Sequence, residues 1–227
     1  MTCWKSRFLR TTLTKTLTSR LALVAGGTVA ASLLLAFGAG LQPLAAADRP
    51  ALALMAVTLS LPLGAFVSGR ASTLRDAGER AAGSLLAGVL LAACFTLFEP
   101  ALFVRTAVWC GAAALLGGSL GALHIAAGFA AALGWLLLCG LTFFVEKLPG
   151  DLWRDYALHG CPWLGFSQDA FGGDPLRRSV LYLGHWSELR DEPAFNLLRA
   201  HTLWLTGALT LAAALVYAAT TQRKQPT

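Results

Sequence analysis

Residues 101–145 read ALFVRTAVWCGAAALLGGSLGALHIAAGFAAALGWLLLCGLTFFV and carry one charged side chain, Arg105. A helix that crosses the hydrocarbon core of a bilayer needs about 20 apolar residues. This stretch is long enough for two such helices, and His124 divides it near the middle. We therefore predict spanning helices at 101–123 and 125–145, joined by a tight turn.

Further apolar runs of similar length occupy residues 21–41, 51–69, 81–98 and 201–220, and the second contains Pro62. Charged residues make up 13% of the chain, against about 25% in soluble domains. The composition therefore predicts an all-α membrane protein with about six transmembrane helices. We divide it into a basic interfacial segment (1–20), a five-helix membrane bundle (21–145), an outer segment of short helices and turns (146–200), a sixth transmembrane helix (201–220) and a cytoplasmic tail (221–227).

The distribution of basic residues predicts the orientation. Residues 1–20 contain five basic residues and no acid, the loop GRASTLRDAGER (69–80) contains three arginines, and the tail contains two more basic residues. The positive-inside rule then puts both termini and the 69–80 loop in the cytoplasm, and the 146–200 segment outside. We expect the inner membrane of a bacterium. The acid-free, Ser/Thr-rich N-terminus also fits a mitochondrial transit peptide, so the mitochondrial inner membrane stays as the alternative.

Polar residues inside the apolar runs are few. Arg105 is expected to reach the outer headgroups, with Glu99 as its partner, and His124 to be a solvated turn residue. The motif Gly117-x-x-x-Gly121 is expected to serve helix packing within the chain. The middle of each predicted span lacks Asp, Glu and Lys, which argues against a carrier driven by protons or sodium.

The outer segment holds the chemical variety of the chain. We expect short helices in LPGDLWRDYALHG (148–160) and CPWLGFSQDAF (161–171), and a turn in GGDP. His159, Cys161 and His185 are the candidate ligands for a soft metal or haem, but their spacing matches no metal motif, so no metal is predicted. Cys161 could act as a nucleophile with a histidine base, but nothing supplies an oxyanion hole. Asp169 and Asp174 are interpreted as turn residues rather than as paired carboxylates.

No Gly-rich phosphate loop follows a strand pattern, so we expect no nucleotide hydrolysis, no enzyme activity and no cofactor in this chain itself. The basic charge is interpreted as a topology signal, and no nucleic-acid partner is expected.

The layout resembles the type-2 family of ABC-transporter permeases. Members of that family have a basic amphipathic helix before the first span, a short cytoplasmic helix between spans two and three that contacts the ATPase, and short re-entrant helices outside, between spans five and six. The matching pieces here are the basic N-terminal segment, the charged 69–80 loop and the outer segment, which is longer than a re-entrant hairpin needs. The resemblance implies a separate ATPase subunit that supplies ATP hydrolysis, a second permease copy or paralogue, and export of a lipid-like or peptide cargo. The residues implied in ATPase docking are Arg70, Arg75, Asp76, Glu79 and Arg80.

Two other readings stay open. The chain could be a non-catalytic accessory or assembly subunit of a larger respiratory or secretion complex in the membrane. Its outer segment would then bind partners, with Trp153, Trp163 and Trp186 as anchors. An intramembrane enzyme that acts through Cys161 or through the histidines and aspartates of the outer segment is the third possibility.

Overall fold

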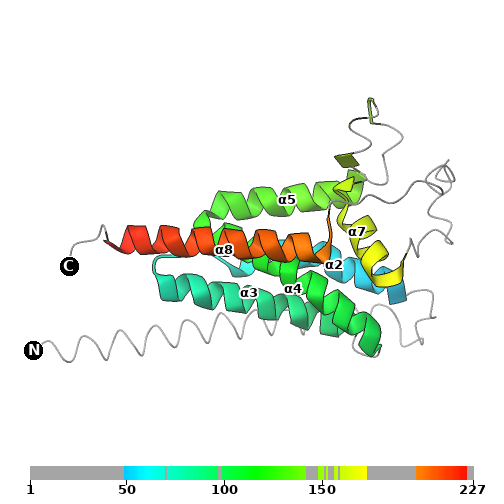
Figure 1. Cartoon of the computed structure of the whole chain (residues 1–227), viewed down its shortest axis with the longest axis horizontal. Helices are drawn as coiled ribbons and strands as arrows, with labels where there is room; N and C mark the ends of the chain where they lie inside the picture. The colour runs from blue at the N-terminus through cyan, green and yellow to red at the C-terminus, as the bar shows by residue number, and fades with distance from the viewer. Residues whose placement is uncertain are drawn as a thin grey trace, which may run out of the picture. The chain divides into compact units, whose positions relative to one another are not determined.

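A computed structural model describes residues 49–69, 71–96, 99–141, 148–150, 152, 156–157, 159–172 and 198–223, all of which belong to one compact unit, residues 44–227. The regular structure in these residues is helical (Figure 1). The helices are α2 (Arg49–Val67), α3 (Leu74–Thr96), α4 (Pro100–Leu123), α5 (Ile125–Leu141), α7 (Pro162–Phe171) and α8 (Ala200–Arg223). The predicted N-terminal segment 1–20 and first span 21–41 lie outside the described residues.

Four of these helices, α2, α3, α4 and α8, are long and apolar enough to cross a membrane. α5 is also apolar and is described over 17 residues. The residues that follow it, 142–147, lie outside the described part of the chain. Large apolar side chains lie exposed along its outer face, among them Phe129, Leu133 and Leu137. Such a surface is what lipid covers, since soluble monomers rarely expose apolar patches of this extent. The described helices therefore support the prediction of an α-helical integral membrane protein.

The helix that contains the predicted third span begins before that span. α3 begins at Leu74 rather than at Ala81, so the second half of the predicted 69–80 loop is helical. The local chemistry explains the early start. The Thr73 hydroxyl accepts the backbone N–H of Asp76 at 3.1 Å, as a capping side chain does. Ion pairs four residues apart then favour the first turns of the helix.

This early start also bears on the short cytoplasmic helix that the resemblance implies between spans two and three. Between α2 and α3, the described residues 68, 69 and 71–73 contain no separate helix. Arg75, Asp76, Glu79 and Arg80 instead belong to α3 itself.

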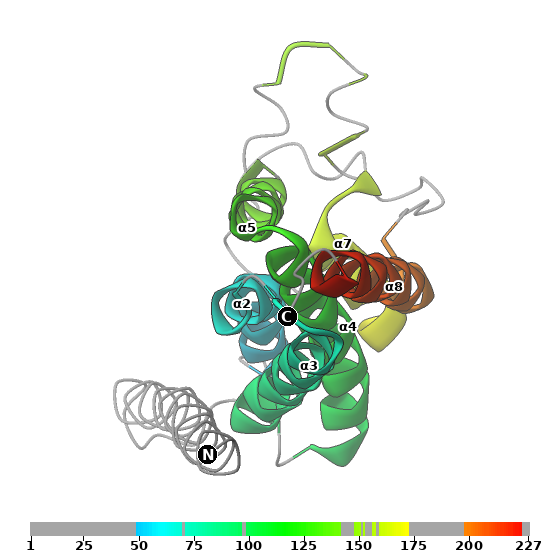
Figure 2. The ribbon, with the colours of Figure 1, turned by 90° about the vertical axis from the view of Figure 1, so that its left-hand side faces the viewer.

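α4 is the central helix of the described unit. It contacts α2, α3, α5, α7 and α8. In its most apolar stretch of 18 residues, 72% is buried inside the protein, against 22% for the corresponding stretch of α8. Figure 2 shows these helices end on, with α2, α3, α5 and α8 around the axis that α4 follows. The central helix of the bundle therefore comes from the first half of the apolar stretch 101–145.

Glycines allow the helix backbones to touch. A Cβ atom at Gly64 of α2 would overlap the carbonyl of Ala114, and one at Gly88 of α3 would overlap the carbonyl of Cys110. Gly117 of α4 lies against the Leu61 carbonyl of α2 in the same way, and a Cβ atom at Gly121 would lie 3.3 Å from the Ala65 carbonyl oxygen. The Gly-x-x-x-Gly motif therefore packs helices within the chain, as expected.

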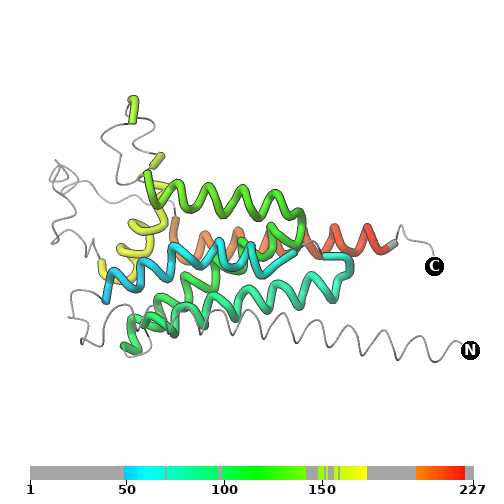
Figure 3. Tube along the Cα trace, turned by 180° about the vertical axis from the view of Figure 1, so that it is seen from behind, coloured from blue at the N-terminus to red at the C-terminus, as the bar shows by residue number. Residues whose placement is uncertain are grey.

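α7 closes one end of the bundle. It follows Cys161, has Pro162 in its first turn and ends at Gly172, whose φ of 69° is the left-handed conformation of many helix ends. It contacts α2, α4, α5 and α8. Figure 3 shows it beside the first residues of α2 and α8 and the last residues of α5. We call this the α7 end, and the opposite end, where α3 begins, the Arg75 end.

Candidate functional site

A carboxylate at the α7 end joins three helices. Asp169 of α7 accepts a hydrogen bond from Nη1 of Arg199 at 2.8 Å, and from Nε1 of Trp109 in α4 at 3.1 Å. It also accepts the backbone N–H of Ala200, the first residue of α8, at 3.1 Å. Asp169 and Arg199 form an ion pair whose side chains are 26% and 31% exposed. We call these four residues the Asp169 cluster.

The cluster satisfies groups that the helix ends leave open. The first N–H groups of a helix have no partner inside it, and a negative charge near them is favoured by the helix dipole. Asp169 fills this role for α8 although it comes from α7. Helix α7 continues through Asp169 to Phe171, so the short helix predicted at 161–171 is confirmed and the interpretation of Asp169 as a turn residue is wrong. The glycines that suggested a turn come only after the helix has ended, and Asp174 lies outside the described residues.

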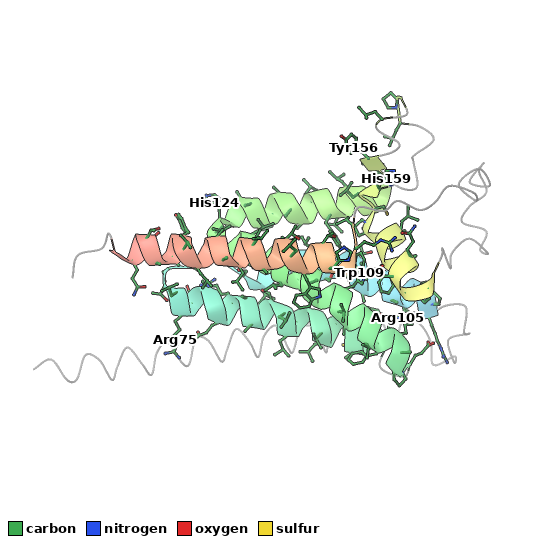
Figure 4. All side chains as sticks on the ribbon, viewed as in Figure 1. Arg75, Arg105, Trp109, His124, Tyr156 and His159 are labelled. Carbon is green, nitrogen blue, oxygen red and sulfur yellow. The ribbon has the colours of Figure 1, made fainter. Side chains whose placement is uncertain are left out.

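Arg105 also reaches α7. Its guanidinium donates to the backbone carbonyl of Ala170. Glu99 instead forms an ion pair with Arg49, with 3.5 Å between Oε2 of Glu99 and Nη1 of Arg49. The predicted Arg105–Glu99 pair is therefore wrong. The last carbonyls of a helix are unsatisfied and carry partial negative charge, which explains why α7 attracts this cation. Figure 4 shows Arg105 and Trp109 on α4, both toward the α7 end.

Aromatic rings fill the space under α7. Phe166 is fully buried and lies edge-on to Trp109 and to Phe171, with ring centroids 5.9 and 5.8 Å apart. Trp163, a predicted partner anchor, is half-buried and donates its Nε1–H to the Thr58 hydroxyl of α2 at 2.6 Å. Its polar edge is thus used within the chain. The other predicted anchors, Trp153 and Trp186, lie outside the described residues.

Two of the three candidate metal ligands lie within the described part of the chain. Cys161 is fully buried at the start of α7, and His159 is half-buried two residues before it. No group of three His, Cys, Asp or Glu side chains among the described residues could hold a metal ion. His185 lies outside these residues.

At the Arg75 end, α3 presents four of the five residues implied in docking. Arg75 and Glu79 form an ion pair of 2.7 Å, and the Arg75 side chain is 88% exposed. Asp76 and Arg80 form a second pair of 2.7 Å, with both side chains less than a quarter exposed. The first pair faces outward, whereas the second ties the start of α3 down, with the N–H of Ser72 also donating to Asp76 at 3.0 Å. Arg70 is outside the described residues.

His124 lies exposed in the turn between α4 and α5, as expected. Its Nδ1 accepts the backbone N–H of Ala126 at 3.2 Å, so it helps to begin α5. Figure 4 shows it toward the same end of the bundle as Arg75.

Trp109 and Arg199 of the Asp169 cluster were not singled out from the sequence. Each carried a signal: Trp109 is an indole N–H donor within an apolar span, and Arg199 is a cation directly before the last span. A buried donor and a cation at a helix start both need an acceptor.

Comparison of the chain with known protein families, with characterised proteins and with solved structures finds no match.

Proposed function

We propose that this chain is a transmembrane permease subunit of an ATP-driven exporter, and that a separate ATPase subunit docks on the start of α3. The observation that carries the proposal is the outward-facing Arg75–Glu79 pair, which sits on a helix that continues without a break to Thr96. A partner bound to this pair would hold the end of a membrane-spanning helix directly.

The packing of α3 supports transmission of movement from such a partner. The backbone of α3 touches that of α4 at Gly88, and the Ser84 hydroxyl lies 3.4 Å from the Gly64 carbonyl of α2. Close-packed helices move as rigid bodies rather than by gradual deformation. A displacement of the start of α3 would therefore shift the contacts along α2 and α4.

In this proposal the Arg75 end faces the cytoplasm of a bacterial cell, both termini are inside, and the α7 end faces out. Two copies, or this chain and a paralogue, enclose the path. The described spanning helices carry little charge in their middle portions, which suits a lipid-like or peptide cargo better than a small ion.

The test is purification of the tagged protein in mild detergent, with mass spectrometry of the proteins that accompany it. The informative variant is the double swap Arg75→Glu with Glu79→Arg. It keeps an ion pair four residues apart and improves its orientation relative to the helix dipole, so α3 stays folded. It also reverses the order of the two charges on the docking surface. We therefore expect that an ATPase which recognises this order no longer copurifies with the variant.

The matched control is the double swap Arg49→Glu with Glu99→Arg, which reverses a half-exposed ion pair at the α7 end. We expect it to retain the ATPase. Recovery of redox or secretion subunits without any ATPase would overturn the proposal and favour the accessory-subunit alternative. If the same amount of ATPase copurifies with both double variants, the assignment of Arg75 and Glu79 to the docking surface is wrong.

A further inference from the structure

Arg105 is a charged side chain on a surface that faces lipid. The exposed residues in the first turns of α4 are Ala101, Val104, Arg105 and Val108. Their spacing puts them on one side of the helix. Val104 is 58% exposed and Val108 is 41% exposed, as apolar side chains in contact with acyl chains are. Arg105 therefore lies on a side of α4 that the bilayer covers.

The position of Arg105 along α4 brings it near the lipid headgroups. α4 has 24 residues, which is about 36 Å at a rise of about 1.5 Å per residue, against about 30 Å of hydrocarbon. Arg105 comes five residues after Pro100, so it lies within about 8 Å of the helix start. A long arginine side chain at that depth carries its guanidinium to the phosphates of the nearer leaflet.

The contacts of Arg105 leave positive charge at this place. Its guanidinium carries several N–H donors, and Nη1 donates to the Ala170 carbonyl, which has no full charge. Arg199 binds Asp169, the residue next to Ala170 in α7. Within the described ranges, no carboxylate forms an ion pair with Arg105. Two cations therefore contact neighbouring residues of α7, and one carboxylate balances them.

We propose that Arg105 binds the phosphate group of an anionic phospholipid at the edge of α7, and that Arg199 adds the second positive charge that favours an anionic headgroup. The planar guanidinium of arginine matches phosphate oxygens with two parallel hydrogen bonds. Val104 and Val108 give the acyl chains an apolar surface beside it. A soluble phosphate ion gains nothing from these valines, so the phosphate is that of a lipid. The inference requires that the bundle lies in a membrane, and depends neither on transport nor on which end faces out.

The experiment is native mass spectrometry of the full chain in mild detergent, titrated with phosphatidylglycerol or with phosphatidylcholine of the same acyl chains. Both lipids have a phosphate, but phosphatidylcholine also carries a cation and is neutral. We expect the first phosphatidylglycerol to bind about tenfold more tightly than phosphatidylcholine, as a charge-assisted contact provides. Equal binding of the two lipids would overturn the proposal.

Variants of single arginines assign the site. Arg105→Gln should lose the preference for phosphatidylglycerol. Arg105→Lys keeps the charge, so it should retain a weaker preference, because an ammonium group lacks the planar fork of arginine. The matched control is Arg49→Gln, which removes a half-exposed cation from the same end of the bundle and should keep the full preference. An unchanged preference in Arg105→Gln, or an equal loss in Arg49→Gln, would show that Arg105 is not the site.

Thermal unfolding in detergent separates a lipid site from a site for a free anion. We expect phosphatidylglycerol to raise the apparent Tm of the unaltered protein, and to raise that of Arg105→Gln less. Millimolar inorganic phosphate should leave both unchanged. A rise with inorganic phosphate that depends on Arg105 and equals the rise with lipid would overturn the lipid assignment. None of these measurements involves an ATPase, so this inference and the permease proposal can fail separately.

Discussion

Asp169 is the residue on which the α7 end depends most. Asp169→Ala leaves the Arg199 guanidinium and the Trp109 N–H without their acceptor in a partly buried place. Loss of one partner from such a group costs about 2–3 kcal/mol, because the remaining polar atoms are not rehydrated. We expect a clearly lower apparent Tm in detergent.

The control for this prediction is Glu99→Ala, which breaks a half-exposed ion pair at the same end. Exposed pairs contribute about 0–1 kcal/mol, so its Tm should stay near that of the unaltered protein. Equal losses in the two variants would show that Asp169 is not a central acceptor.

The individual residues of this cluster could not be predicted as a group from the sequence. Trp109 and Asp169 are 60 positions apart, and local pattern does not report contacts at that separation. The motif that the sequence did predict correctly, Gly117-x-x-x-Gly121, is local to one helix. Even there, the sequence did not indicate that α2 is its partner.

At the scale of the helix, the glycine contacts are the most sensitive feature. Gly64→Ala and Gly88→Ala each drive a methyl group into the backbone of α4. Overpacking of this kind costs about 1–3 kcal/mol, and rigid backbone neighbours put these sites at the upper end. We expect poor recovery of folded protein by size-exclusion chromatography.

Gly134→Ala on α5 is the matched control, since an added Cβ there meets nothing within 4 Å. Replacing glycine by alanine inside a helix stabilises it by about 0.5–1 kcal/mol, so this variant should be recovered at least as well as the unaltered protein. Equal loss in all three variants would point to a general intolerance of alanine rather than to close helix contacts.

The two ion pairs at the start of α3 should differ in their effect on stability. Arg80→Ala leaves Asp76 without its partner in a place less than a quarter exposed, and should cost about 1 kcal/mol. Arg75→Ala breaks an exposed pair and should cost at most about 0.5 kcal/mol. Melting curves of the two variants measure the difference. A larger loss in Arg75→Ala would contradict the division into an outward pair and a tethering pair.

The apolar runs predicted the helices well, because twenty uncharged residues leave the backbone few other structures in lipid. The predicted starts of α2, α4, α5 and α8 agree with the structure within a few residues. The start of α3 was missed because its first turns are charged, and charge was interpreted as loop. Hydropathy marks where a helix enters the hydrocarbon core, not where it begins.

For the whole molecule, the orientation in the membrane is the prediction on which the proposed function depends. It can be tested with single cysteines at two exposed positions on either side of α5, His124 and Tyr156, in a variant that lacks the natural cysteines. Figure 4 shows His124 toward the Arg75 end and Tyr156 toward the α7 end. A charged maleimide that does not cross the inner membrane should label Tyr156→Cys in intact cells. His124→Cys should react only after the cells are permeabilised.

The reverse labelling pattern would place the Arg75 end outside. The ATPase proposal would then fail, because no ATP-hydrolysing subunit could reach α3. The expected pattern instead keeps the proposed function, since it puts the charged start of α3 within reach of a cytoplasmic ATPase.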